Sequence, residues 1–287
     1  MPNLNELKNR VAAVRGTQQV TNAMYLISAS KSRRAKKKSE AVKPFFDEVK
    51  TALTEIFTDR ASGFDSVFAN SAPDATRVLC FAIGGDKGMA GGYNHNIIKF
   101  MADNLDKSNT AVLMAGFMGR GRAQREGFDV DPEFIYPVMN PSLDRARDIA
   151  DEIMKKYRSG MYKEMCLIYT KMVSALRQEP EMLTLLPLTP EHFNAPQASA
   201  AGKYHTFHFE PGPAEVIDSL TPHYLRGVIY AALVEANTCE LQSRMMAMDN
   251  ATKSADDIIK SLTLRYNRAR QSIITQEITE IVSGMPD

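Results

Sequence analysis

The segment with the clearest potential for chemistry is glycine-rich. It covers Gly84–Asn94 and reads GGDKGMAGGYN. It follows an apolar run and precedes an expected helix, where backbone N–H groups could cradle a phosphate. It lacks both the GxxxxGK[ST] order of a phosphate loop and the GxGxxG order of a dinucleotide site, and Gly119–Gly121 fails because Gln124 stands at the third glycine position. A structural turn is the favoured interpretation, and an enzyme that binds a phosphorylated ligand here is the alternative.

Two histidines and three cysteines could support metal or nucleophilic chemistry. His205 and His208 are three apart on an expected strand, so they point to opposite faces, which is poor geometry for chelation. Cys80, Cys166 and Cys239 are far apart and outside any CxxC spacing, which indicates small buried residues in a reducing compartment. No Ser/His/Asp set follows from spacing, because such a triad is assembled in space. We predict no cofactor, no metal site and no catalytic residue.

The third feature is a basic run, Lys31–Lys38, with the sequence KSRRAKKK. Residues 1–60 contain twelve Lys and Arg against six Asp and Glu, although the whole chain carries a formal net charge of only +1. Such a run could hold nucleic acid, an anionic lipid surface or an acidic protein partner. The alternative is a solvated helix face.

Long helices at both ends of the chain must position these features. Asn3–Lys43 has no proline and one glycine, and Pro44 predicts a kink or a break before helix resumes over Phe46–Phe57. The 63 residues between Pro222 and Pro286 contain no proline and would extend about 95 Å as one helix. Apolar residues recur there at threes and fours, which predicts an antiparallel coiled coil of the two ends. In that pairing Leu4–Val14 lie beside Ile273–Val282.

The middle of the chain has the pattern of an α/β domain. Short apolar runs alternate with helical segments, which favours a central, largely parallel sheet. The expected strands cover 77–83, 110–117 and 164–169, with later ones at 181–188 and 204–209, and the expected helices cover 96–104, 119–126 and 143–157. The predicted fold class is therefore α/β plus coiled coil: long antiparallel terminal helices and a central Rossmann-like α/β domain. The predicted segments are 1–60, 75–210 and 211–287.

Composition excludes some classes of protein. With 287 residues, 24% charged and 44% hydrophobic, the chain is not intrinsically disordered. No stretch approaches the roughly 18 apolar residues of a membrane span, and the first residues do not resemble a secretory signal. We expect a cytoplasmic protein, or one on the cytoplasmic side of a membrane.

Several segments resemble one family, the gamma subunit of the rotary F-type ATP synthase. Thr17–Lys31 (TQQVTNAMYLISASK) is similar to the family's TQKITxAMxMVAASK, and Asp86–Asn94 (DKGMAGGYN) to its DRGLCGGxN. The most specific similarity is Ser243–Thr252 (SRMMAMDNAT), followed by Tyr266–Gln271 and Ile274–Gly284. Order, spacing and length agree over essentially the whole chain.

The resemblance implies a rotor shaft that couples ion-driven rotation of the c-ring to ATP synthesis and hydrolysis. The implied partners are the alpha and beta subunits, the epsilon subunit and the c-ring, with no nucleic acid. It implies a non-catalytic chain held peripherally, through the complex, at the cytoplasmic face of the bacterial plasma (inner) membrane. The rival interpretation is a nucleic-acid-binding coiled coil that uses the run 31–38 on phosphates.

The resemblance also implies two sets of contact residues. The first set faces the beta subunits, which carry an acidic loop in this family, and comprises Met24, Arg270, Gln271, Thr275, Gln276 and Glu277. The second set forms an apolar tip held in a collar of the alpha and beta subunits, as in a bearing, and comprises Ile273, Ile274, Ile278, Ile281 and Val282.

Overall fold

The computed structural model describes residues 4–59, 66–174, 177–189, 192, 210 and 212–284. The chain divides into two compact units, one of residues 1–30 with 244–287 and one of residues 31–243. The predicted segments 1–60, 75–210 and 211–287 divide the chain differently and stay a prediction. The expected strand 204–209, with His205 and His208, lies outside the described residues. In the described part of the chain, no helix is long and apolar enough to cross a membrane.

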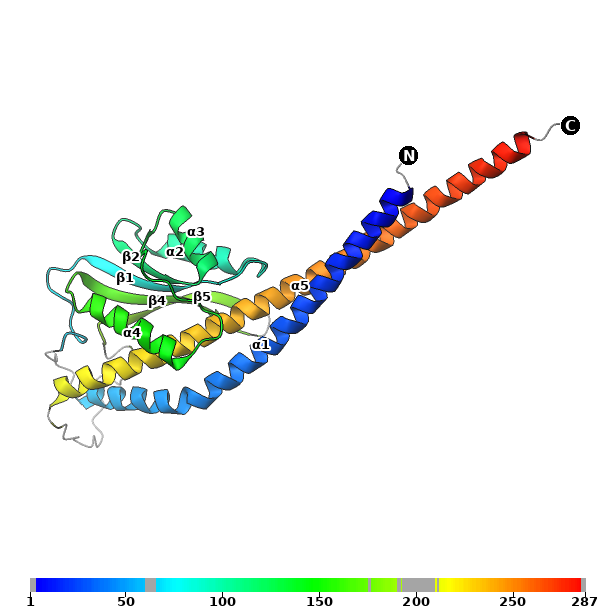
Figure 1. The fold of residues 1–287 in the computed structure, drawn as a ribbon. Helices are drawn as coiled ribbons and strands as arrows, with labels where there is room; N and C mark the ends of the chain where they lie inside the picture. The colour runs from blue at the N-terminus through cyan, green and yellow to red at the C-terminus, as the bar shows by residue number, and fades with distance from the viewer. Residues whose placement is uncertain are drawn as a thin grey trace. The chain divides into compact units, whose positions relative to one another are not determined.

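The second unit is built on a five-stranded sheet with the order β3-β2-β1-β4-β5 (Figure 1). The strands β3, β2, β1 and β4 run parallel, and β5 is antiparallel to β4. The predicted α/β class is confirmed, but β3 was not expected, because two residues are too short to show a periodic pattern. The bounds are β1 (Arg77–Ile83), β2 (Thr110–Ala115), β3 (Asp129–Val130), β4 (Tyr162–Met172) and β5 (Gln178–Leu186).

Helices cover both faces of this sheet. One face packs against α4 (Leu143–Tyr157) and against parts of α1 (Leu4–Asp59) and α5 (Pro213–Ser283). The other face packs against α2 (Tyr93–Asn104) and α3 (Phe117–Arg125). Both faces are therefore apolar, which is why the strands read as continuous hydrophobic runs.

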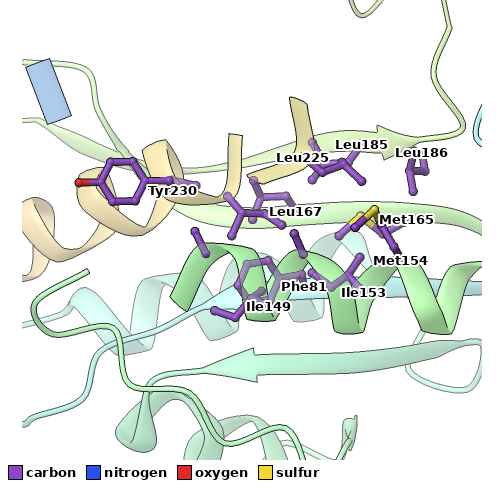
Figure 2. Close-up of a cluster of buried hydrophobic side chains, with 14 of the residues drawn as sticks. Phe81, Ile149, Ile153, Met154, Met165, Leu167, Leu185, Leu186, Leu225 and Tyr230 are labelled. Atoms are coloured by element: carbon purple, nitrogen blue, oxygen red, sulfur yellow. The ribbon is translucent and has the colours of Figure 1, made fainter. Parts of the chain in front are cut away.

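Alternate residues of β1 supply the two faces. Leu79, Phe81 and Ile83 join the cluster with α4 and α5, and Cys80 and Ala82 join the cluster with α2 and α3. All five are fully buried. Figure 2 shows the first cluster, where side chains of the sheet, α4 and α5 interdigitate. The sheet is thus fixed between two apolar layers.

The two terminal helices are continuous. α1 runs through Pro44 without a break, and α5 begins at Pro213 and runs through Pro222. A proline inside a helix removes one backbone hydrogen bond. Beyond Pro44, Leu53 and Ile56 are almost fully buried, so the apolar contacts of the last turns hold the helix in place. The destabilisation of α1 by Pro44 is therefore smaller than the stabilisation that these buried contacts provide.

In the first unit α1 and α5 are paired antiparallel. The Gln18 amide donates to the Asp256 carboxylate at 2.5 Å, and the hydroxyls of Thr21 and Thr252 lie 2.7 Å apart. Residues farther along α1 thus face earlier residues of α5, at about one residue of α5 per residue of α1, because both helices have the same rise. Continued at this register, Leu4 lies opposite about residue 270.

The predicted pairing of Leu4–Val14 with Ile273–Val282 is therefore wrong. The antiparallel direction is right, but the register differs by more than two turns, and Leu4–Val14 lie beside about residues 260–270. The reason is that polar pairs set the register, while apolar periodicity repeats along both helices and fits several registers. The end of α5 beyond about residue 270 has no α1 beside it.

The glycine of α5 gives the first testable prediction. A Cβ at Gly227 would collide with the ring of Phe46 on α1, whereas a Cβ at Gly16 of α1 would meet nothing within 4 Å. Alanine normally stabilises a helix by about 0.5–1 kcal/mol relative to glycine. Gly16→Ala should therefore raise the free energy of unfolding, and Gly227→Ala should lower it, because overpacking costs about 1–3 kcal/mol. Urea denaturation of the two purified variants measures both changes, and an equal gain would show that Phe46 moves freely.

Candidate functional site

The glycine-rich segment forms a close-packed joint at the carboxyl end of β1. A Cβ at Gly84 would lie 2.8 Å from the Cα of Gly119 in α3. Gly116 has a φ of +92°, and a Cβ there would lie 2.7 Å from the Gly84 carbonyl oxygen. The backbone N–H groups of Met118 and Gly119 both donate to the Gly85 carbonyl, at 3.0 and 3.2 Å. These glycines let two backbones touch, as a structural turn requires.

The N-terminus of α3, beside the glycine-rich segment, receives a side chain of the protein, that of Asp86. One carboxylate oxygen of Asp86 accepts hydrogen bonds from the N–H groups of Val138 and Met139, at 2.9 and 2.6 Å. The other oxygen lies 3.4 Å from the N–H of Phe117, the first residue of α3. A helix N-terminus favours an anion, and here the anion is internal. This role of Asp86 was not predicted, although an acid between glycines after a strand is its sequence signal.

The three cysteines do not form a reactive site. All are buried, and Cys80 on β1 is paired in register with Cys166 on β4. The hydrogen bond to Cys166, together with burial, raises the pKa of the Cys80 thiol. Burial raises the pKa of Cys239 to about 12. Since the thiolate is the nucleophile, Cys80 and Cys239 are unreactive at neutral pH. The described residues contain no group of three or more His, Cys, Asp or Glu that could hold a metal.

The basic run lies on α1, and those of its cations whose side chains the structure describes are exposed. Arg33, Arg34 and Lys37 are solvent-exposed, and Ala35 is buried against the core. Among the described side chains, none of these three cations forms an ion pair. Lys31 is also exposed, and its Nζ lies 4.0 Å from the sulfur of Met139. The described cations of the run thus lie on an exposed face of α1.

The residues that the resemblance places against the beta subunits lie at two levels of the helix pair. Met24 is half-buried and, at the observed register, lies opposite Asp249–Asn250. That level is about 20 residues, or about 30 Å of helix, from Arg270. The structure therefore does not bring Met24 together with the five α5 residues. Those five are exposed, and they are Arg270, Gln271, Thr275, Gln276 and Glu277.

The predicted apolar tip is exposed where α5 extends past α1. Ile274, Ile278 and Ile281 are 45%, 56% and 67% exposed, and their spacing puts them on one side of the helix. We call these three residues the tip stripe. Ile273 is half-buried, and the side chain of Val282 lies outside the described set.

The comparisons with known proteins agree with this arrangement. The sequence matches the ATP synthase family over residues 3–286. It is 40% identical over 291 residues to the ATP synthase gamma chain of Acetivibrio thermocellus, covering 99% of this chain and 98% of the relative. The gamma chain of Ruminiclostridium cellulolyticum is 38% identical over 286 residues, with 98% and 97% covered. The chain belongs to the ATP synthase gamma chain family. As a member of this family it is the non-catalytic rotor shaft of the ATP synthase.

Solved structures share the fold. The rotor of the Euglena gracilis mitochondrial ATP synthase matches with a TM-score of 0.63 at 12% identity, covering 94% of this chain and 98% of that one. The central stalk of the Tetrahymena thermophila mitochondrial enzyme matches with a TM-score of 0.57 at 21% identity, with 81% and 99% covered. The predicted rotor identity and the predicted fold are confirmed. Nothing in these comparisons supports the nucleic-acid alternative.

The Asp86 contacts give the second testable prediction. Because the anion position at α3 holds an internal carboxylate, millimolar MgATP should leave the melting temperature of the purified chain unchanged. A ligand at 100 times its Kd would add about 2.7 kcal/mol. Asp86→Asn should lower the free energy of unfolding by about 1 kcal/mol or more, because the bonds from Val138 and Met139 lose their charged acceptor. ATP-dependent stabilisation of the parent chain would restore the nucleotide-site interpretation.

Proposed function

We propose that the helix pair of the first unit turns inside a ring of alternating alpha and beta subunits, while the α/β domain joins the epsilon subunit and the c-ring. The observation that carries this proposal is the extension of α5 past α1, which leaves an apolar stripe exposed at the end of a paired shaft. Similar solved structures are the rotor and the OSCP/F1/c-ring assembly of the Euglena gracilis mitochondrial ATP synthase, which supports partners of this kind.

The proposed location follows from the partners. The related gamma chains come from bacteria such as Acetivibrio thermocellus and Ruminiclostridium cellulolyticum. We place the chain at the cytoplasmic face of the bacterial plasma membrane, held peripherally through the complex. In this proposal segments 1–60 and 211–287 act as the shaft, and 75–210 as the foot that receives rotation. The direct test is co-purification with alpha, beta and epsilon subunits from native membranes, and recovery of the chain alone would contradict it.

The tip stripe acts as a bearing surface in this proposal. A bearing must hold the shaft without favouring one angle, and apolar contact is non-directional. Each isoleucine that becomes buried in a partner's collar would contribute about 1.5–3 kcal/mol. Ser272, Thr279 and Ser283 would remain outside this contact, because their spacing puts them on the opposite side of α5.

Substitutions in the stripe test the bearing. The triple variant Ile274→Ser, Ile278→Ser and Ile281→Ser should lower the yield of assembled complex, because the apolar contribution to assembly is lost. The matched control is Ser272→Ala, Thr279→Ser and Ser283→Ala, three changes on the opposite side of the same turns, which should assemble normally. Yield is measured by size-exclusion chromatography, and ATP hydrolysis by the assembled fraction. Equal yields for the two variants would rule the bearing out.

Met24 tests the contact with the beta subunits. Met24→Lys would place a cation near the acidic loop that the family resemblance implies, and a charged hydrogen bond there is worth about 1.5–3 kcal/mol. The extra bond must break at each step, so the ions pumped per ATP hydrolysed should fall, while ATP hydrolysis continues. Met24→Gln is the control, because it is of similar length and uncharged. The two rates are measured on the same inverted vesicles, and unchanged pumping per ATP in Met24→Lys would contradict this placement.

A further inference from the structure

We propose that a polar clamp between the glycine-rich segment, the sheet and α5 fixes the rotational angle of α5 in the α/β domain. The clamp consists of three hydrogen bonds, and each joins α5 to a different element of the α/β domain. The Tyr93 hydroxyl donates to the Ala236 carbonyl at 3.1 Å. The N–H of Met172 donates to the Glu235 carboxylate at 3.0 Å, and the Ser243 hydroxyl donates to the Gln178 side chain at 2.8 Å. The inference rests on the rotor function of the chain.

The clamp gathers distant parts of the sequence around nine residues of α5. Tyr93 opens α2, Met172 ends β4 and Gln178 opens β5. Their partners on α5 all fall between Glu235 and Ser243. Hydrogen bonds to three different elements restrain rotation of the helix about its axis, because any such rotation would stretch or break at least one of them.

The Tyr93–Ala236 hydrogen bond of the clamp is buried and the other two are partly buried, so breaking the first is the most costly. Tyr93 is 4% exposed and Glu240 is 3% exposed. Tyr93 packs with Ala90 and Cys239 in a small apolar cluster. Burial and the nearby Glu240 carboxylate raise the pKa of Tyr93, which keeps the hydroxyl protonated as a donor. A buried donor or acceptor that loses its partner is not compensated by water.

The glycine-rich segment has to approach α5 closely for this geometry. A Cβ at Gly85 would lie 3.1 Å from the Glu240 carboxyl carbon and 3.1 Å from the side-chain amide of Asn94. The Gly85 N–H donates to that amide oxygen at 2.7 Å. Asn94 therefore holds the loop while Tyr93, its neighbour, reaches α5. This gives the glycines of the motif a mechanical purpose in place of phosphate binding.

The earlier part of α5 combines apolar packing with two polar contacts: Arg226 donates to the Asp151 carboxylate at 2.8 Å, and the Ser66 hydroxyl donates to the Asp218 carboxylate at 2.6 Å. Leu225 and Tyr230 belong to the apolar cluster of Figure 2, and so do Ile229 and Leu233. Apolar packing resists separation but is weakly directional, whereas hydrogen bonds fix an angle. The three hydrogen bonds of the clamp lie where the second unit ends, at Ser243. Torque received by the α/β domain would pass into α5 through this clamp.

The test measures torsional stiffness in the assembled complex. A bead is attached to the α/β domain, the alpha and beta ring is fixed to a surface, and the angular variance is recorded during catalytic pauses. The variant Tyr93→Phe, Glu235→Ala and Ser243→Ala breaks all three bonds. Glu235→Gln with Ser243→Thr is the matched control, because it keeps an acceptor and a hydroxyl. Leu225→Ala is the second control, because it weakens apolar packing alone.

The breaking variant should show an angular variance about twofold larger or more, and amide exchange over 235–243 about fivefold faster, with hydrolysis unchanged. Both controls should keep the parent's variance. Unchanged variance in the breaking variant, or an equal increase in Leu225→Ala, would overturn the clamp. If the triple variant does not assemble, the single variant Tyr93→Phe, which removes one oxygen, takes its place. Unchanged angular variance in that variant would then overturn the clamp. A parent chain that does not assemble or rotate would instead refute the rotor function.

Discussion

The structure depends on one constraint: a helix of 71 residues cannot bury its apolar side chains by itself. The chain meets this constraint in two ways along α5. In the second unit α5 packs on the sheet beside α4, and in the first unit it pairs with α1. Because α1 begins the chain and α5 ends it, the sheet between them is an insertion into a helical hairpin. The first and the last helix of the chain are therefore partners over part of their lengths, although no local pattern connects them.

The α/β domain resembles folds that bind phosphates in its strand order and in the glycine-rich turn after β1. In this chain, however, groups of the protein itself occupy the space beside that turn. Asp86 lies at the N-terminus of α3, and Gly84 packs against Gly119. A carboxylate fixed by backbone donors meets the same electrostatic requirement as a bound phosphate. The fold thus persists without the ligand, which fits a subunit that transmits force while the chemistry takes place elsewhere in the complex.

The sequence predicted the elements with strong periodicity and missed those decided by tertiary contacts. β1 and α4 were predicted with their observed bounds, because an unbroken apolar run and an amphipathic pattern are local signals. Pro44 was expected to kink or break the helix, and α1 has no break there, because burial of Leu53 and Ile56 outweighs the local cost. The clamp was missed altogether. Its only signal was a pair of acids, Glu235 and Glu240, within an apolar stripe of α5.

The distribution of polar and apolar contacts suits a shaft whose two helices must not shift against each other but which must turn against its partners. Within the helix pair, Thr21 and Thr252 share a hydrogen bond, and any shift of register would leave both hydroxyls without this partner. Such bonds are directional, so they fix the position of one helix along the other. The exposed end of α5 instead presents isoleucines, whose contacts depend on buried area and little on angle. An interface of that kind can remain closed while the helix turns, which directional bonds would prevent.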